Sequence, residues 1–149
     1  MTPVDTIESV LTLKGRQVFS VAPSATVYEA IEKMSEKGVG ALLVLEDGRL
    51  AGIISERDYA RKVILRDRSS KQTEVREIMT SDVLTVTPQH TVEECMRMMT
   101  ENRTRHLPVV SRDRVVGMIS IGDLVNWIIT AHEETIGHLQ NYISGSYPG

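Results

Sequence analysis

Apolar and polar positions follow two alternating patterns along the chain. Short, mostly apolar runs at residues 40–45, 50–55, 106–110 and 115–120 predict buried strands. Apolar residues at helical spacing within residues 27–34 and 92–99 predict amphipathic helices, and each begins at a threonine that can cap it, Thr26 or Thr91. A shorter helix is expected over residues 5–13. With a short strand before each longer helix and a helix after each second hairpin strand, the pattern reads strand, helix, strand, strand, helix, twice.

The first and the second set of predicted elements coincide when the chain is shifted by 65 residues. The stretch Gly-apolar-apolar-Ser-x-x-Asp occupies residues 52–58 and recurs at residues 117–123. The same shift aligns Pro23 with Pro88 and Thr26 with Thr91 without a gap. An internal repeat of this length indicates two copies of one supersecondary unit. We therefore predict an α+β fold in which two pseudo-symmetric β-α-β-β-α motifs pack as one module.

The repeat also suggests where the parts of the chain begin and end. We expect the first motif at residues 10–68, a linker at 69–82, the second motif at 83–130, and a C-terminal helix and tail at 131–149. In that last segment Ile136, Leu139 and Ile143 form a separate apolar stripe. The stripe either packs on a partner subunit or folds back on its own domain.

Composition narrows the setting in which the protein works. A chain of 149 residues can bury a core without staples, and its single cysteine, Cys95, lies on a predicted apolar helix face. We expect a reducing, cytoplasmic location. The net charge of −3 gives no support to nucleic-acid binding, and no apolar run approaches the length needed to cross a membrane.

The sequence supports neither a catalytic triad nor a metal site. Ser120, His106 and Asp123 are present, but there is no nucleophile elbow and no base with an orienting partner in view. The four histidines are scattered, and His132 lacks the second histidine that a zinc-binding helix needs at i+4. We expect no catalytic activity, no metal site and no required cofactor.

The repeated motif itself favours a nucleotide. A strand that ends in serine and turns into a helix aims free backbone N–H groups at one point, which attracts phosphate. Asp123, one turn into its helix, can accept hydrogen bonds from both hydroxyls of a ribose. This predicts AMP, ADP, ATP or NAD rather than NADP. The same Ser-x-x-Asp pattern is also that of an ordinary helix cap, and this alternative stays open.

Taken together, these features resemble a tandem pair of cystathionine β-synthase (CBS) domains. The resemblance rests on the order of elements, on the proline before each predicted helix, on Arg105-His106-Leu107-Pro108-Val109 opening the second hairpin, and on the motif that closes each unit. It covers residues 10–130 and is closer to the small bacterial stand-alone proteins made of one CBS pair. It implies two pseudo-symmetric halves with adenine nucleotides in the clefts between them, and a homodimer.

The resemblance also implies which residues bind the nucleotide, since each cleft combines both copies. The expected main site comprises Lys14, Val18, Val39, Gly40, Ala41, Arg105, His106, Ser120, Ile121, Gly122 and Asp123. The expected second site comprises Ser55, Arg57, Asp58, Val83 and Leu84. We expect the second site to be weaker, because Glu56 and Arg57 bring charges beside Asp58 where the other copy has Ile121 and Gly122.

The sequence therefore predicts a non-catalytic regulatory module. Adenine nucleotide is its expected ligand, and a change in conformation or in the dimer contact is its expected signal to an unidentified protein partner. The alternative is a protein interaction or dimerisation module that needs no ligand.

Overall fold

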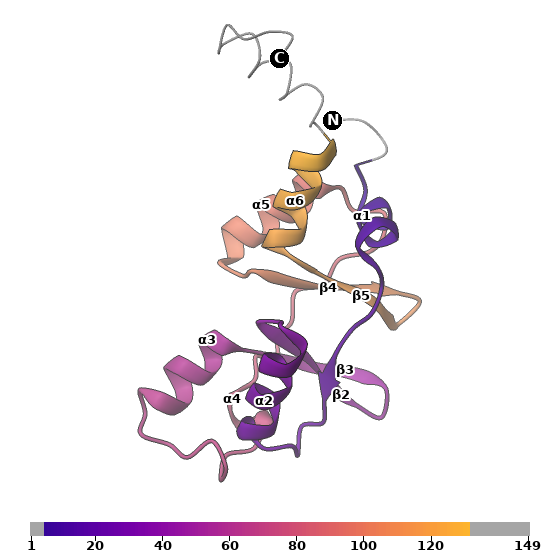
Figure 1. Cartoon of the computed structure of the whole chain (residues 1–149). Helices are drawn as coiled ribbons and strands as arrows, with labels where there is room; N and C mark the ends of the chain where they lie inside the picture. The colour runs from indigo at the N-terminus through magenta and orange to yellow at the C-terminus, as the bar shows by residue number, and fades with distance from the viewer. Residues whose placement is uncertain (1–4, 132–149) are drawn as a thin grey trace, which may run out of the picture.

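The computed structural model describes residues 5–131 and consists of two similar units (Figure 1). The first unit contains β1 (Ser20–Val21), α2 (Val27–Lys37), β2 (Ala41–Glu46), β3 (Arg49–Ser55) and α3 (Glu56–Tyr59), which continues as the π-helical turn η1 (Ala60–Ile64). Its sheet has the order β1-β2-β3, with β1 parallel and β3 antiparallel to β2. The second unit contains α5 (Val92–Asn102), β4 (His106–Ser111), β5 (Arg114–Ser120) and α6 (Ile121–Ala131). The predicted hairpins, and the predicted helices that fall within residues 5–131, are thus confirmed, whereas the C-terminal helix expected after residue 131 lies outside the described residues.

The predicted first strand of the second unit is absent as a strand. It is reduced to a single parallel bridge between Val86 and Val109, at the positions that correspond to Val21 and Val44. In the first unit Leu43 N donates to Phe19 O at 3.1 Å and extends the pairing. The residue that corresponds to Leu43 is Pro108, which has no N–H to donate. The proline therefore explains why the pairing stops at one bridge.

Both hairpins have the same register. Ala41 lies opposite Ser55 in the first, and His106 lies opposite Ser120 in the second. The turns have positive φ at both central positions, at Asp47 and Gly48 and at Arg112 and Asp113, as two-residue hairpin turns require. Each hairpin consequently brings the first residue of one strand beside the serine that precedes the next helix.

The helix α1 (Ile7–Lys14) packs on the second unit although it precedes the first in the chain. Its buried residues Ile7, Val10 and Leu11 belong to the core that Cys95 and Leu124 share. Figure 1 shows α1 beside α6 and β5, far from α2 and β2. The first repeat therefore supplies the second unit with a helix.

The reverse exchange takes place in the stretch between the units. The predicted linker contains a short helix, α4 (Val75–Ile78), whose Val75 and Ile78 are buried in the core of the first unit. Val75 N donates to Ala25 O, as Ile7 N donates to His90 O in the second unit, both at 2.8 Å. Each unit is thus completed by the segment that precedes the other one along the chain.

The glycine of each repeated motif lies where this exchange needs space. A Cβ on Gly117 would lie 2.7 Å from Leu11 Cδ2, and a Cβ on Gly52 would lie 2.7 Å from Thr80 O and 2.8 Å from Met79 Sδ. Side-chain carbons rarely approach other atoms so closely. Glycine at the head of the motif therefore allows the exchanged segment to contact the hairpin.

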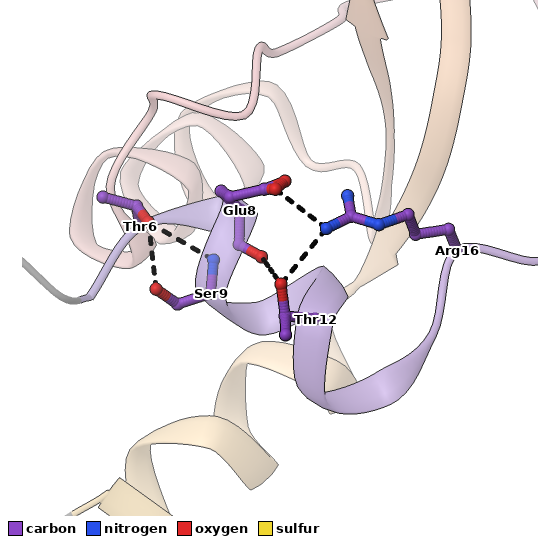
Figure 2. A network of polar contacts seen from close by, with 5 residues as sticks. All are labelled: Thr6, Glu8, Ser9, Thr12 and Arg16. Carbon is purple, nitrogen blue, oxygen red and sulfur yellow. Dashed lines mark hydrogen bonds and ion pairs between the residues drawn. The ribbon is translucent and has the colours of Figure 1, made fainter.

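The exit of the chain from α1 is fixed by polar contacts, which Figure 2 shows. Thr6 Oγ1 caps the start of the helix by accepting from Ser9 N at 3.3 Å. After Gly15, Arg16 folds back and donates to Glu8 Oε2 at 2.8 Å and to Thr12 Oγ1 at 3.1 Å. Arg16 is therefore held on α1 itself, while its neighbour Lys14 reaches the second unit.

Two smaller expectations have different outcomes. Thr91 and Glu94 form a complete capping box, but in the first unit only Glu29 N bonds to Thr26 Oγ1, and the exposed Glu29 carboxylate does not return the bond. Cys95 is buried, as predicted, and burial raises its pKa to about 12, which suits a packing role. The predicted stripe of Ile136, Leu139 and Ile143 lies outside the described residues.

Candidate functional site

Each hairpin ends at the serine of its motif, and the next helix begins directly after it. Asp58 N donates to Ser55 Oγ at 3.2 Å, and Ser55 N donates to Asp58 Oδ2 at 2.9 Å. Asp123 N donates to Ser120 Oγ at 3.1 Å, and Ser120 N donates to Asp123 Oδ2 at 2.8 Å. Both aspartates therefore cap their helices, as one of the two sequence interpretations requires, and both use Oδ2 to do so.

The two aspartates differ in their lysine partners. Lys62, one turn further along the same helix, lies 2.9 Å from Asp58 Oδ1, so both oxygens of Asp58 are engaged. Lys14, from α1, donates to Asp123 Oδ2 at 2.6 Å and to Met118 O at 2.8 Å. Within residues 5–131 no donor reaches Asp123 Oδ1. Asp123 thus keeps one oxygen open to a ligand.

A cleft of about 650 Å³ opens between the two units on the side of Asp58. Its size lies in the usual range for small-molecule sites, about 300–1,000 Å³. Both units contribute to its walls. The lining residues are Gly40, Ile53, Ser55, Glu56, Arg57, Asp58, Thr80, Asp82, Val83, Leu84, Asn102, Arg103, Thr104, Arg105, His106, Ser120 and Ile121.

Charges of both signs line this cleft. The guanidinium groups of Arg57, Arg103 and Arg105 can each hold an anionic group, whereas Glu56 and Asp82 favour hydrogen-bond donors. Arg57 Nη1 lies 3.5 Å from Arg103 O, which joins the first unit to the loop before β4. The cleft is therefore suited to a ligand that carries both an anionic group and hydroxyl or amino donors.

Arg103 adopts an unusual backbone conformation at the edge of the cleft. Its φ is 52°, in the left-handed region, and the corresponding residue of the first unit is Gly38, with φ 67°. A side chain in this conformation costs about 1–2 kcal/mol relative to glycine. The second unit thus has an arginine at a position where the fold favours glycine.

His106 lies where the two units meet. A Cβ on Gly40 would lie 3.0 Å from Glu56 Oε1 and 3.9 Å from the His106 ring, so Gly40 leaves room for both side chains. Burial lowers the pKa of His106; the negative charge of Asp123 opposes this effect, and the positive charges of Lys14 and Arg105 add to it. His106 is therefore neutral at pH 7 and can both donate and accept a hydrogen bond.

The charge of Asp123 is stabilised by its neighbours. Partial burial by itself would raise the pKa of this carboxyl group. The hydrogen bonds from Lys14 and Ser120 N outweigh burial and hold the pKa below its usual value. Asp123 is thus a carboxylate at neutral pH, as an acceptor for ribose hydroxyls must be.

The structure brings together part of the expected main site and the whole of the expected second site. The five second-site residues all line the cleft: Ser55, Arg57, Asp58, Val83 and Leu84. Five main-site residues join them: Gly40, Arg105, His106, Ser120 and Ile121. The remaining six do not line it: Lys14, Val18, Val39, Ala41, Gly122 and Asp123. That the Asp123 cleft is the better nucleotide site stays a prediction. The cleft of about 650 Å³ lies on the side of Asp58, and its volume favours that side instead.

The six other residues lie outside this lining. Lys14 and Asp123 pair with each other, Ala41 is buried in β2, and Val39 packs against the core of the first unit. Val18 precedes β1 in the chain and Gly122 lies in the first turn of α6.

Several lining residues were not predicted, among them Thr80, Asp82, Asn102, Arg103 and Thr104. The repeat holds the signal for one of them, Thr104. A shift of 65 residues takes the expected Val39 and Gly40 to Thr104 and Arg105, and Gly38 to Arg103. The shift predicts that the loop at residues 103–105 lines the Asp58 cleft, just as the loop at residues 38–40 is expected to line the Asp123 cleft.

Within residues 5–131 none of the helices combines the length and the hydrophobicity that a membrane-spanning helix needs. No group of three or more His, Cys, Asp or Glu side chains in this part of the chain is arranged to hold a metal ion.

Comparison with known proteins connects this architecture to a family. The sequence profile of the CBS domain matches residues 10–65 and again residues 75–130. The mitochondrial CBS domain-containing protein CBSX3 of Arabidopsis thaliana is 43% identical over 151 residues, which covers 95% of this chain and 73% of the relative. A putative signal-transduction protein with CBS domains from Burkholderia ambifaria MC40-6 has a solved structure that is 51% identical, with a TM-score of 0.82, over 84% of this chain and 94% of the other.

A more distant structure shares the fold alone. The CBS domain pair of protein MJ0100, solved in complex with 5′-methylthioadenosine and S-adenosyl-L-methionine, is 22% identical, with a TM-score of 0.74, over 83% of this chain and 94% of the other. The two profile matches coincide with the two units that the 65-residue repeat defines. The chain therefore belongs to the CBS-domain family and contains two CBS domains that form a pair.

Proposed function

We propose that this protein is a non-catalytic regulatory module that binds an adenine nucleotide between its two CBS domains. The observation that carries the proposal is the cleft of about 650 Å³, whose walls come from both units. The MJ0100 pair, which shares the fold, was solved with two adenosyl compounds, and this supports an adenosine-containing ligand. A ligand bound by both units changes the free energy of their relative arrangement, which is what a regulatory signal requires.

The lining residues suggest how the nucleotide lies in the cleft. Val83 and Leu84 offer an apolar wall for the base, and Arg103 and Arg105 offer partners for phosphate. Asp58 can accept a ribose hydroxyl only if it shares an oxygen that already binds Ser55 or Lys62. Asp123 has a free oxygen, so we propose the Asp123 cleft as a second place for a ribose.

The test is a thermal-unfolding panel with AMP, ADP, ATP, NAD and NADP. A ligand at about one hundred times its dissociation constant adds about 2.7 kcal/mol, which for a chain of this size raises the midpoint by roughly 5–10 °C. We expect a shift with one or more nucleotides that have a free ribose diol, and a smaller shift with NADP. The proposal is wrong if no nucleotide changes the wild-type midpoint.

Three variants test which cleft is responsible for the change in thermal midpoint. Asp58→Ala and Asp123→Ala each remove one carboxylate. The variant in which the nucleotide raises the thermal midpoint least therefore identifies the occupied cleft. Arg103→Gly installs the residue that the first unit has at this position, and it should weaken phosphate-dependent binding without destabilising the unliganded fold.

One observation favours a second function, a protein interaction or homodimer contact. Ile64 and Ile129 occupy equivalent positions of the two units and have exposed fractions of 56% and 54%. Exposed apolar residues at matching positions are typical of a contact surface. If the nucleotides have no effect and sedimentation equilibrium shows a dimer that Ile64→Ser and Ile129→Ser dissociate, the interaction module is the correct function.

A further inference from the structure

The pair between Lys14 and Asp123 joins parts of the chain that are 109 residues apart. Lys14 is the last residue of α1, whereas Asp123 lies in the first turn of α6. The corresponding aspartate of the first unit, Asp58, takes its lysine from its own helix, four residues later. Only the second unit therefore has an aspartate that is held by a side chain from the exchanged segment.

Lys14 occupies one of the two Asp123 oxygens, so only the other oxygen is free for a ribose. A carboxylate oxygen has about two acceptor positions. Asp123 Oδ2 already accepts from Lys14 Nζ at 2.6 Å and from Ser120 N at 2.8 Å. Oδ1 is free to accept ribose hydroxyls, but an arrangement with one hydroxyl on each oxygen requires Lys14 to leave Oδ2.

A displaced Lys14 remains close to Asp123. Ile7, Val10 and Leu11 fix α1 in the core, so the backbone of Lys14 cannot move away with its side chain. The Lys14 side chain is 32% exposed and the Asp123 side chain is 25% exposed, so the lysine can change partner without breaking the core. An ammonium group that gives up a carboxylate needs another anion, because a half-buried charge without a partner is costly.

The phosphate of the ligand itself supplies that anion. We propose that Lys14 makes the Asp123 cleft selective for phosphorylated nucleosides, because it exchanges Asp123 for the ligand's phosphate as the ribose binds. With an unphosphorylated nucleoside the lysine loses its partner and gains none. This role rests on the proposed function, since it concerns the affinity of the same module for nucleotides.

The test compares adenosine and AMP by isothermal titration calorimetry. Asp58→Ala protein is used throughout, so that the other cleft lacks its carboxylate and contributes less to the measured binding. In Lys14→Met we expect adenosine to bind about threefold more tightly, since a competing ion pair is gone. AMP should bind more weakly, since a charge-assisted hydrogen bond to phosphate is lost. The preference for AMP over adenosine should fall at least about tenfold.

Two lysine variants serve as controls. Lys14→Arg keeps the charge and should keep most of the preference for AMP. Lys62→Met removes a positive charge near the other cleft, where Asp58→Ala has already taken away the partner of Lys62, and should leave the preference unchanged. Thermal unfolding of each variant without ligand shows whether it is folded.

The outcomes separate this role from the proposed function. If neither the wild-type nor the Asp58→Ala protein binds AMP or adenosine, the proposed function and the role of Lys14 are both wrong. If wild type binds but the Asp58→Ala protein with Lys14 intact binds neither, or if Lys14→Met in the Asp58→Ala protein changes the two affinities by the same factor or not at all, only the role of Lys14 is wrong. If Lys62→Met lowers the preference for AMP as much as Lys14→Met does, the preference depends on the total positive charge and not on the position of Lys14. The role of Lys14 is then wrong as well.

Discussion

At the scale of single residues, the glycines of the repeated motif are defined by contact with the exchanged segments. In Gly117→Ala the new methyl group would lie 2.7 Å from Leu11, which is fully buried and cannot turn away freely. We expect the free energy of unfolding to fall by about 1–3 kcal/mol, as for other overpacked cores. Gly52→Ala should cost at least as much, because its nearest neighbour is the backbone carbonyl of Thr80. Urea denaturation followed by circular dichroism measures both.

A third glycine provides the control. A Cβ on Gly122 would meet only Ser120 Oγ, at 3.7 Å, and the residue lies in a helix. Gly122→Ala should leave stability unchanged or raise it by up to about 1 kcal/mol. If Gly117→Ala is as stable as Gly122→Ala, the contact between Leu11 and β5 is looser than the structure shows.

At the scale of elements, α1 is expected to stabilise the unit to which it does not belong in sequence. Leu11→Ala leaves a cavity in the core that contains Cys95 and Leu124. We expect the free energy of unfolding to fall by about 2–5 kcal/mol. The single tryptophan, Trp127, packs against this core, so its fluorescence during urea unfolding reports the loss directly.

The same helix offers a matched control. Leu13 has an exposed fraction of 60% and no place in the core. Leu13→Ala should change stability by no more than about 0.5 kcal/mol. Equal effects of the two substitutions would mean that α1 does not contribute its buried face to the second unit.

The exchange of α1 and α4 also marks how far the elements could be predicted. Apolar periodicity and the 65-residue shift predict both hairpins, both long helices and the buried face of each. Periodicity says which face is buried but not which core it enters, so the destinations of Val10 and Val75 could not be predicted. The missing strand near Val86 could have been predicted, because Pro108 stands where the first repeat has a residue with an N–H group.

At the scale of the whole molecule, the candidate site depends on the space between the units. The repeat and the family resemblance predict Asp58, Asp123 and the central residues Arg105 and His106. They do not predict how much volume each cleft has, since that depends on how the two cores are set against each other. The family resemblance places Lys14 and Asp123 in one expected site, but their direct ion pair has no sequence signal, because it arises only when α1 crosses to the second unit.

The stability of the molecule should depend on pH in two separate windows. Burial lowers the pKa of His106 below its ordinary value of 6.5. As the pH falls below 6.5 the unfolded chain therefore takes up a proton that the folded protein does not, so stability decreases down to the folded pKa. The pKa of Asp123 is held below its ordinary value of 3.8, so its contribution is present above 3.8 and is lost only as the pH falls further.

Thermal midpoints measured between pH 8 and pH 3 would separate the two groups. His106→Gln keeps a neutral polar side chain that does not titrate, so its curve should be flatter below pH 6.5 while its decline below pH 3.8 remains. Asp123→Asn should show the opposite, with a lower midpoint at neutral pH and a smaller further decline in acid. If His106→Gln follows the wild-type curve between pH 6.5 and pH 4, then His106 is protonated equally in the folded and unfolded chains. The boundary between the units would in that case be open enough to water to hydrate the imidazolium, and the His106 ring that lines the cleft would be a cation.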